Sequence, residues 1–287
     1  MRKTISILCA AAVLTAVTAR AQLTVQCSVS SPRVLQYEPI IATLTVGNHT
    51  SEPIELTSSG PDARVSFDVE DAPGSLVNPT DVSVLTSPLR IQPQETKQAK
   101  VNLLSAYRIS RAGPYTITAR VRWGGKIFIS PKVFLDVLPG LEIAKLVAGM
   151  PGGKGSRTFS LRTLSRDLAE RVFLRIDDED QGTCYGVFDL GRIVRLYSPR
   201  MTVDGLGHVH VLHQSGPWQY THTEFTSDGR PVRSDLYSSQ SSTVSMQRGE
   251  EGDVSIEGAD PINAEPEDVE ATPEPSRGSD ESKPANR

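Results

Sequence analysis

The sequence predicts an all-β protein with two successive antiparallel β domains, and three observations support this fold class. Short apolar segments recur with alternating polar residues from Leu23 onward. Gly, Pro and Gly-Asn or Asp-Gly turns separate them at short spacing, and no convincing amphipathic helix lies between them. Such alternation is typical of half-buried strands, and closely spaced strands are typical of sandwiches. The 287 residues, 38% of them hydrophobic, are enough for about two domains.

The N-terminus has the pattern of a secretory signal. Arg2 and Lys3 precede an apolar run over residues 5–17, and Ala19-Arg20-Ala21 supplies the small-x-small sequence that signal peptidases cut. The apolar run is too short to span a bilayer as a helix. We therefore expect residues 1–21 to be a signal peptide and the mature chain to begin at Gln22, in the periplasm or outside the cell.

Residues 22–138 are expected to form an antiparallel sandwich. Residues 23–29 alternate apolar and polar side chains, and a β-branched segment over residues 39–46 stops at Gly47-Asn48, where a turn is favoured. Further strands are expected at residues 54–56, 65–69, 89–91, 97–103, 115–123, 126–129 and 133–137.

Within this segment several turn motifs resemble a known family. Tyr37-Glu38-Pro39-Ile40, Ile91-Gln92-Pro93 and Ala112-Gly113-Pro114-Tyr115 resemble bacterial secreted immunoglobulin-like modules. Tyr115 after Gly113-Pro114 is similar to the turn of proteinase-inhibitor-like sandwich domains. The resemblance implies an immunoglobulin-like β-sandwich. It carries no catalytic residue, because such sandwiches serve adhesion, domain spacing and inhibition alike.

Pro139-Gly140 marks a boundary to a second, smaller β domain, expected over residues 139–260. Its hairpin turns are expected at Asp204-Gly205 and Asp228-Gly229. The segment from Asp204 to Val211, with the aromatic strand and Asp228-Gly229-Arg230 that follow it, is similar to one blade of a β-propeller. A propeller needs several blades, so we expect a small sheet or open sandwich built from propeller-like hairpins.

Two segments of this domain invite a ligand-binding interpretation that their residues do not support. Residues 149–155 are rich in glycine but lack the Gly-x4-Gly-Lys-Ser/Thr spacing of a phosphate-binding loop. Residues 177–180 are four successive carboxylates without the spaced ligands and central glycine of a calcium loop. We expect a flexible turn at the first segment and a solvated acidic turn at the second.

Four of the five histidines lie between residues 208 and 222. On a strand, His208 and His210 point to the same face and can share one zinc ion, and His222 can reach it from the next strand. The spacing also resembles that of cupins, although Gln214 stands near the place of their glutamate; Glu224 can substitute for it. The alternative is that the histidines lie on the polar face of a hairpin while Val209 and Val211 face the core.

The remaining features exclude several functions. No Gly-x-Ser-x-Gly nucleophile motif, nucleotide motif or cofactor motif occurs. The formal charge of −4 disfavours a nucleic-acid partner, and no apolar stretch after Gln22 is long enough to span a membrane. Cys27 and Cys184 remain after signal removal and are either buried thiols or one disulfide. The acidic residues 261–287 are expected to be a disordered tail.

Two classes of function follow. The first is a noncatalytic binding or structural protein of the cell envelope that presents its β domains to a protein or glycan partner, with protease inhibition as a variant. The second is a metal-dependent enzyme that uses His208, His210 and His222. The absence of a strong catalytic motif in the sequence favours the first class.

Overall fold

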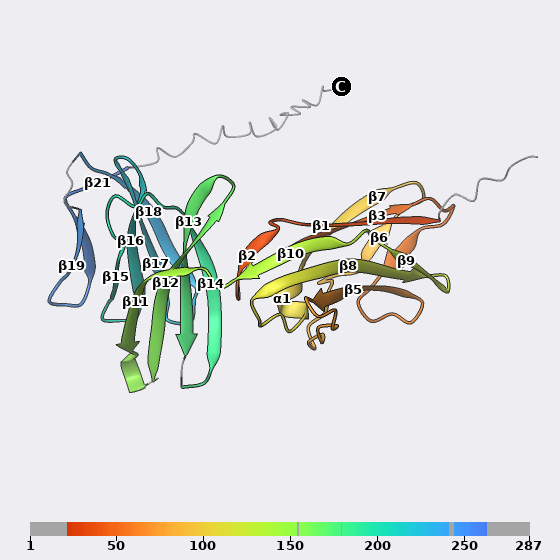
Figure 1. Ribbon diagram of the computed structural model, residues 1–287, viewed down its shortest axis with the longest axis horizontal. Coiled ribbons are helices and arrows are strands. Elements are labelled where there is room, and N and C mark those ends of the chain that lie inside the picture. The colour runs from red at the N-terminus through yellow and green to blue at the C-terminus, as the bar shows by residue number, and fades with distance from the viewer. Residues whose placement is uncertain (1–21, 154, 179, 241–243, 263–287) are drawn as a thin grey trace, which may run out of the picture.

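The computed structural model describes residues 22–262 except residues 154, 179 and 241–243, and this part of the chain is almost entirely β (Figure 1). Two β domains follow one another, and the chain passes between them at residues 139 and 140. The predicted all-β fold class is confirmed. The expected signal peptide and residues 263–287 of the expected tail lie outside the described residues.

The N-terminal domain is built from two main sheets. One has the strand order β1-β3-β7, and the other has the order β2-β10-β8-β5 with β9 also paired to β8. Strands β4 and β6 form a separate pair, and β2 with β10 is the parallel pairing in the domain. The elements are β1 (Leu23–Val29), β2 (Arg33–Leu35), β3 (Ile41–Asn48), β4 (Ile54–Leu56), β5 (Ala63–Asp71), β6 (Leu89–Ile91), β7 (Thr96–Asn102), α1 (Leu103–Ala106), β8 (Gly113–Trp123), β9 (Lys126–Ile129) and β10 (Val133–Leu138).

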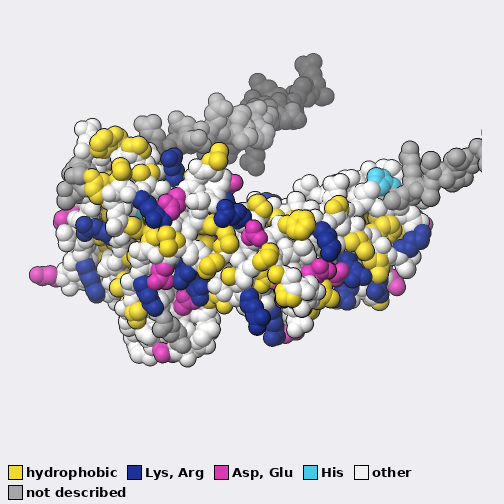
Figure 2. Space-filling view, viewed as in Figure 1, with side chains coloured by type: hydrophobic (Ala, Val, Ile, Leu, Met, Phe, Trp, Pro, Cys, Tyr) yellow, Lys and Arg dark blue, Asp and Glu magenta, His cyan; other side chains and the backbone are white. Residues whose placement is uncertain are grey.

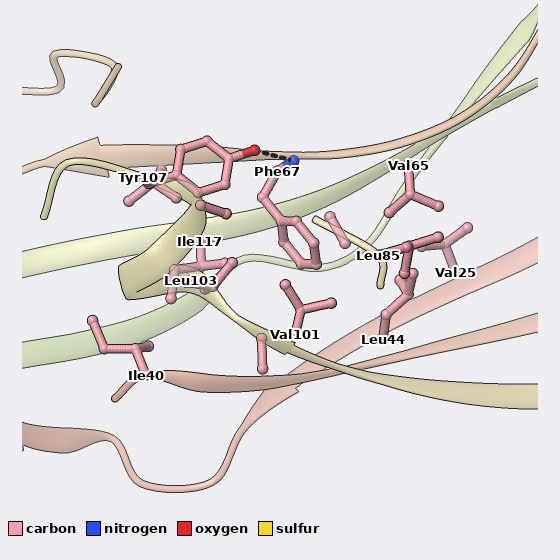
Figure 3. Close-up of a cluster of buried hydrophobic side chains, with 14 of the residues drawn as sticks. Val25, Ile40, Leu44, Val65, Phe67, Leu85, Val101, Leu103, Tyr107 and Ile117 are labelled. Carbon is pink, nitrogen blue, oxygen red and sulfur yellow. Dashed lines mark hydrogen bonds between the residues drawn. The ribbon is translucent and has the colours of Figure 1, made fainter. Parts of the chain in front are cut away.

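The core of this domain lies between the two main sheets. Val25 and Leu44 from one sheet meet Val65, Phe67 and Ile117 from the other (Figure 3). The alternating apolar residues of β1 and β3 supply one wall, as the sequence pattern predicts. Helix α1 closes one side of the core, where Leu103 is fully buried.

Two tyrosine hydroxyls tie irregular segments to the sheets. The Tyr115 hydroxyl donates a hydrogen bond to the carbonyl of Arg111, four residues upstream, at 2.9 Å. This is the geometry of a tyrosine corner, which fixes the entry into a long sandwich strand. The buried Tyr107 hydroxyl accepts the backbone N–H of Phe67 at 2.8 Å (Figure 3).

Tyr107→Phe is expected to lower the free energy of unfolding of the N-terminal domain by about 1–3 kcal/mol, because it leaves the buried N–H of Phe67 without its acceptor. Urea unfolding measures this loss. Tyr37→Phe is the control, since no hydrogen bond of the Tyr37 hydroxyl exists within the described residues. Equal stability of the two variants would contradict the structural role of the Tyr107 hydroxyl.

The second domain is a two-layer sandwich. A four-stranded sheet, β11-β12-β13-β14, faces a five-stranded sheet, β15-β16-β17-β18-β21, and the β19–β20 hairpin lies beside the latter (Figure 1). The elements are β11 (Leu141–Gly149), the 3-10 turn η1 (Pro151–Gly153), β12 (Ser156–Arg166), β13 (Ala169–Asp178), β14 (Thr183–Arg192), β15 (Arg200–Val203), β16 (Val209–Gly216), β17 (Gln219–Phe225), β18 (Pro231–Ser238), β19 (Ser245–Arg248), β20 (Val254–Glu257) and β21 (Asp260–Pro261). Strand β21 crosses the expected domain end at residue 260.

The two sheets of the second domain enclose a continuous apolar core. Phe159 and Leu174 from the first sheet pack with Val209, Val211 and Phe225 from the second. Val209 and Val211 therefore face the core as expected. Because side chains alternate along a strand, the residues between them on β16 point to the opposite face of the sheet.

A second apolar cluster and an ion pair join the two domains. Leu35 of β2 packs against Leu164, Phe173 and Val187 of the second domain. Beside this cluster, Arg166 Nη1 lies 2.8 Å from Glu38 Oε1, and both side chains are largely buried. Arg166 also pairs with Asp189 at 2.9 Å. These contacts come from both sides of the junction and hold the domains against one another.

The acidic segment at residues 177–180 differs from the expected solvated turn. Asp178 is only 2% exposed, and its Oδ2 lies 2.8 Å from Nη1 of the equally buried Arg157. Asp177 pairs with Arg175 at 2.7 Å. The sequence pattern missed the burial of Asp178 because its cationic partner, Arg157, belongs to the neighbouring strand β12. Glu179 lies outside the described residues.

The disulfide considered from the sequence does not form. Cys27 and Cys184 are free thiols in different domains, each half-buried. Burial raises the pKa of each thiol to about 11, so both are thiols and not thiolates near neutral pH. Separately, no helix in the described part of the chain has the length and apolar character needed to cross a membrane.

Candidate metal centre

The predicted histidines lie on two adjacent strands of the five-stranded sheet. In the register of β16 and β17, His210 is opposite Glu224 and Leu212 is opposite His222. His210, His222 and Glu224 therefore share the sheet face that points away from the apolar core. On β18, Arg233 is opposite Glu224 on the same face.

This face is not exposed, in contrast to the hairpin alternative considered from the sequence. His210 is 3% and His222 is 0% exposed. The β19–β20 hairpin covers part of the face, where Val244, Met246 and Ile256 pack over Leu212 and Tyr220. The sequence could not predict this burial. The covering segment lies some 30 residues downstream and forms no strand pair with β16 or β17.

Asp204 completes the cluster from the β15–β16 turn. Its Oδ1 accepts the backbone N–H groups of Leu206 and His208, at 2.9 and 2.7 Å, which fixes the carboxylate in an Asx-type turn. Its Oδ2 is then directed at the histidines, 3.4 Å from His210 Nε2 and 3.8 Å from His208 Nδ1. Sequence reasoning identified Asp204 only as a turn residue. The signal available was its position four residues before His208.

The turn that holds Asp204 is braced by the tip of the β19–β20 hairpin. The Gly205 N–H donates to the carbonyl of Gly252 at 2.9 Å. Gly252 has a φ of +86°, and a Cβ at this position would lie 3.1 Å from the Cα of Gly205. This close approach and left-handed conformation both require glycine at position 252.

Glu224 lies between a histidine and an arginine. Its Oε1 is 2.8 Å from His208 Nδ1, and its Oε2 accepts from Arg233 Nε at 2.9 Å. One potential ligand atom from each of Asp204, His210 and Glu224 lies within 4.8 Å of the other two. His208 Nδ1 lies beside these three residues, 2.8 Å from Glu224 Oε1 and 3.8 Å from Asp204 Oδ2.

His222 has a different position from the one predicted. Its Nε2 is 3.1 Å from His210 Nδ1, and the two rings stack with centroids 5.3 Å apart. It therefore contacts the side of the His210 ring opposite the Nε2 that faces Asp204. A partner on the second nitrogen fixes the orientation and tautomer of a ligating histidine. His222 suits that orienting role and not direct ligation.

The charges of the cluster favour a cation. Burial lowers the pKa of His210, and burial together with neighbouring His210 lowers the pKa of His222 to about 4, so both rings are neutral at pH 7. Burial acts to raise the pKa of Asp204, but the His208 backbone N–H and the His210 ring hold it below its ordinary value. Two carboxylates thus face one cationic side chain, Arg233.

A pocket of about 490 Å³ opens beside these residues. Asp204, His210, Glu224 and Arg233 form one wall, and the turn at residues 251–254 forms the other. The cluster is consequently buried within the sheet but reachable from solvent, so an ion has a path of entry.

Comparison with known proteins does not add to this description. No protein-family model matches the chain, and no curated protein matches it. Among solved structures, the sporulation control protein Spo0M from Bacillus subtilis matches with 11% identity and a TM-score of 0.27, over 57% of this chain and 83% of Spo0M. This similarity is too low to assign a fold or a function.

His213 lies on the opposite, core-facing side of β16 and makes the stability of the domain depend on pH. It is 1% exposed, and burial lowers its pKa from 6.5 to about 4. Between pH 4 and pH 6.5, the unfolded chain therefore binds a proton at His213 that the folded chain does not bind. Its contribution to stability is complete above pH 6.5 and falls by up to about 3 kcal/mol as the pH decreases to 4.

We expect His213→Leu to remove this part of the pH dependence. Urea unfolding at pH 7.5 and pH 4.5 measures the loss for both proteins, and the loss should be smaller in the variant. His49→Gln, at an exposed position of the N-terminal domain, is the control. An identical loss in His213→Leu and in the unmodified protein would show that His213 does not titrate as its burial implies.

Proposed function

We propose that this chain is an exported, noncatalytic binding protein of the cell envelope whose second β domain is organised around a divalent metal ion, best matched by zinc. The observation that carries the proposal is the convergence of one ligand atom each from Asp204, His210 and Glu224 within 4.8 Å of one another, with His208 Nδ1 2.8 Å from Glu224 Oε1. Export rests on the expected signal peptide at residues 1–21.

The separations of the donor atoms support a zinc ion. Donors about 2.1 Å from a tetrahedral ion lie about 3.4 Å from one another. The shortest distances within the cluster, 2.8, 3.4 and 3.8 Å, scatter around this value. Zinc also accepts both imidazole nitrogen and carboxylate oxygen. Small side-chain movements therefore suffice to close the site around the ion.

The number of donors favours a structural ion over a catalytic one. Structural zinc sites have four protein ligands, whereas catalytic sites have three and keep one position open. If the ion takes His208 as the fourth donor beside Asp204, His210 and Glu224, no position is left for a substrate on a tetrahedral ion. This supports the noncatalytic class of function.

The second candidate is metal-dependent hydrolysis. The observation that favours it is the pocket of about 490 Å³ beside the cluster. An ion that accepts five or six ligands would keep open positions toward this pocket, where a bound water could act as nucleophile. The identity of the bound metal distinguishes the two candidates.

The N-terminal domain is proposed to be immunoglobulin-like and to present a surface to a protein or glycan partner. The sheet orders and the tyrosine corner at Tyr115 support this fold assignment. Protease inhibition through one of its loops is a variant of this proposal that a panel of secreted proteases tests. The likeness of the second domain to propeller hairpins rests on the sequence motif alone.

Metal analysis of the mature protein, produced without a polyhistidine tag, tests the metal proposal. We expect about one zinc ion per chain by elemental mass spectrometry and loss of that zinc in the double variant His208→Gln with His210→Gln. His49→Gln should retain it, because His49 is exposed in the other domain. Metal-free protein after growth with zinc, or equal zinc in the double variant, would contradict the proposal.

A further inference from the structure

A second pocket lies at the junction of the two domains and shares no lining residue with the pocket beside the candidate metal centre. It has a volume of about 640 Å³. One wall comes from α1 and the segment that follows it, including Leu104 and Ile109, and the other comes from β14, including Tyr185 and Phe188. Figure 1 shows β14 at the side of its sheet that is turned toward the N-terminal domain. We call this space the junction pocket.

The junction pocket is open to solvent, and contacts between the two domains hold its walls in place. The apolar cluster of Leu35, Phe173 and Val187 and the Arg166–Glu38 ion pair connect the same two domains. In addition, the Arg175 guanidinium lies over the ring of Tyr37, a lining residue, 4.9 Å from the ring centroid.

The lining of the junction pocket is mainly apolar and aromatic. Tyr37, Leu104, Ile109, Tyr185 and Phe188 contribute to it. Ligand pockets of proteins have volumes of about 300–1,000 Å³, lie preferentially between domains, and combine such a lining with a few polar groups. The volume and the lining thus suit an apolar body of small-molecule size.

One of the polar residues that line the junction pocket is the cation Arg108. The exposed Arg108 side chain lines the pocket and makes no hydrogen bond or ion pair in the described part of the protein. Its backbone is fixed, because its N–H donates to the carbonyl of Asn78 at 3.0 Å. Figure 2 shows that basic and acidic side chains elsewhere on the visible face lie interspersed. An unpaired guanidinium at an apolar pocket complements an anionic group.

We propose that the junction pocket binds a small amphipathic acid, with its apolar body between α1 and β14 and its carboxylate on Arg108. The ligand is a free monomeric acid, such as a medium-chain carboxylate. This assignment is independent of the metal centre, which lies on the other sheet of the second domain.

Calorimetric titration of the mature protein with decanoate tests the proposal. We expect saturable binding of one decanoate per chain, weakened about fivefold in Arg108→Gln, the upper range for an exposed charge pair. Arg111→Gln, three residues away and outside the lining, should bind as the unmodified protein does. Neutral decanol should bind equally to all three proteins.

Two further variants test the location of the site. Leu104→Glu places a negative charge in the junction pocket, and Ser105→Trp fills it from an exposed position; each should abolish decanoate binding while the melting temperature is retained. Absence of saturable binding to the unmodified protein, or unchanged binding in both variants, overturns the proposal. Sedimentation with phosphatidylglycerol vesicles distinguishes a membrane source: vesicle binding that Leu104→Glu removes would assign the pocket to lipid headgroups and also overturn it.

Discussion

Excess zinc is expected to raise the melting temperature of metal-free mature protein by on the order of 10 °C. An ion that binds only the folded state at 1,000 times its dissociation constant stabilises that state by about 4 kcal/mol, and a domain of this size gains several degrees for each kcal/mol. The ion would replace weak contacts among Asp204, His208, His210 and Glu224 with metal–ligand bonds. Differential scanning calorimetry with and without zinc measures the effect.

Asp204→Asn is the most selective variant for this measurement. The amide oxygen can still accept the N–H groups of Leu206 and His208, so the turn is retained. The charge that faces His208 and His210 is lost. We expect the metal-free variant to melt near the unmodified protein but to gain only a small part of the zinc stabilisation. If zinc raises both melting temperatures equally, Asp204 is not a ligand.

Asp178→Ala is expected to destabilise the second domain by about 3–5 kcal/mol, because it removes the buried carboxylate that lies 2.8 Å from the Arg157 guanidinium. The two side chains are 2% and 9% exposed, and their closest atoms lie 2.8 Å apart. Asp178 Oδ1 also accepts the N–H of Gln181 at 3.0 Å, so a second contact is lost. Urea unfolding measures the change in stability.

The neighbouring Asp177 provides a matched control. Asp177 pairs with Arg175 at 2.7 Å, but both of these side chains are 19% exposed and retain contact with water. Asp177→Ala should therefore cost only about 1 kcal/mol, as expected for a pair close to solvent. Equal losses in Asp177→Ala and Asp178→Ala would show that burial does not set the strength of these pairs.

Much of the fold was predictable from local patterns. The alternation in residues 23–29 and 39–46 corresponds to strands β1 and β3, whereas the turn expected at Gly47-Asn48 is wrong, because both residues still pair within β3. These patterns are local because the alternation of side chains along a strand and the backbone conformation of a turn depend on neighbouring residues only.

The candidate site was predictable in part. The spacing of His208 and His210 indicated a shared face, and Glu224 was identified as a possible substitute ligand. The sequence assigned Asp204 to a turn only, and it placed His222 among the ligands. Both assignments depend on the register between β15, β16 and β17, because this register decides which side-chain atoms come together. The spacing of residues within one strand does not reveal the register.

The sequence by itself therefore determined the all-β class and the two histidines around which a metal site is proposed. Only the tertiary structure decided which residues are buried. The β19–β20 hairpin covers the polar face of β16 and β17, and the Arg157 side chain buries Asp178 in what the sequence suggested was a solvated turn. The physical reason is that burial of a polar side chain depends on elements distant in sequence, whereas strand formation depends on neighbours along the chain.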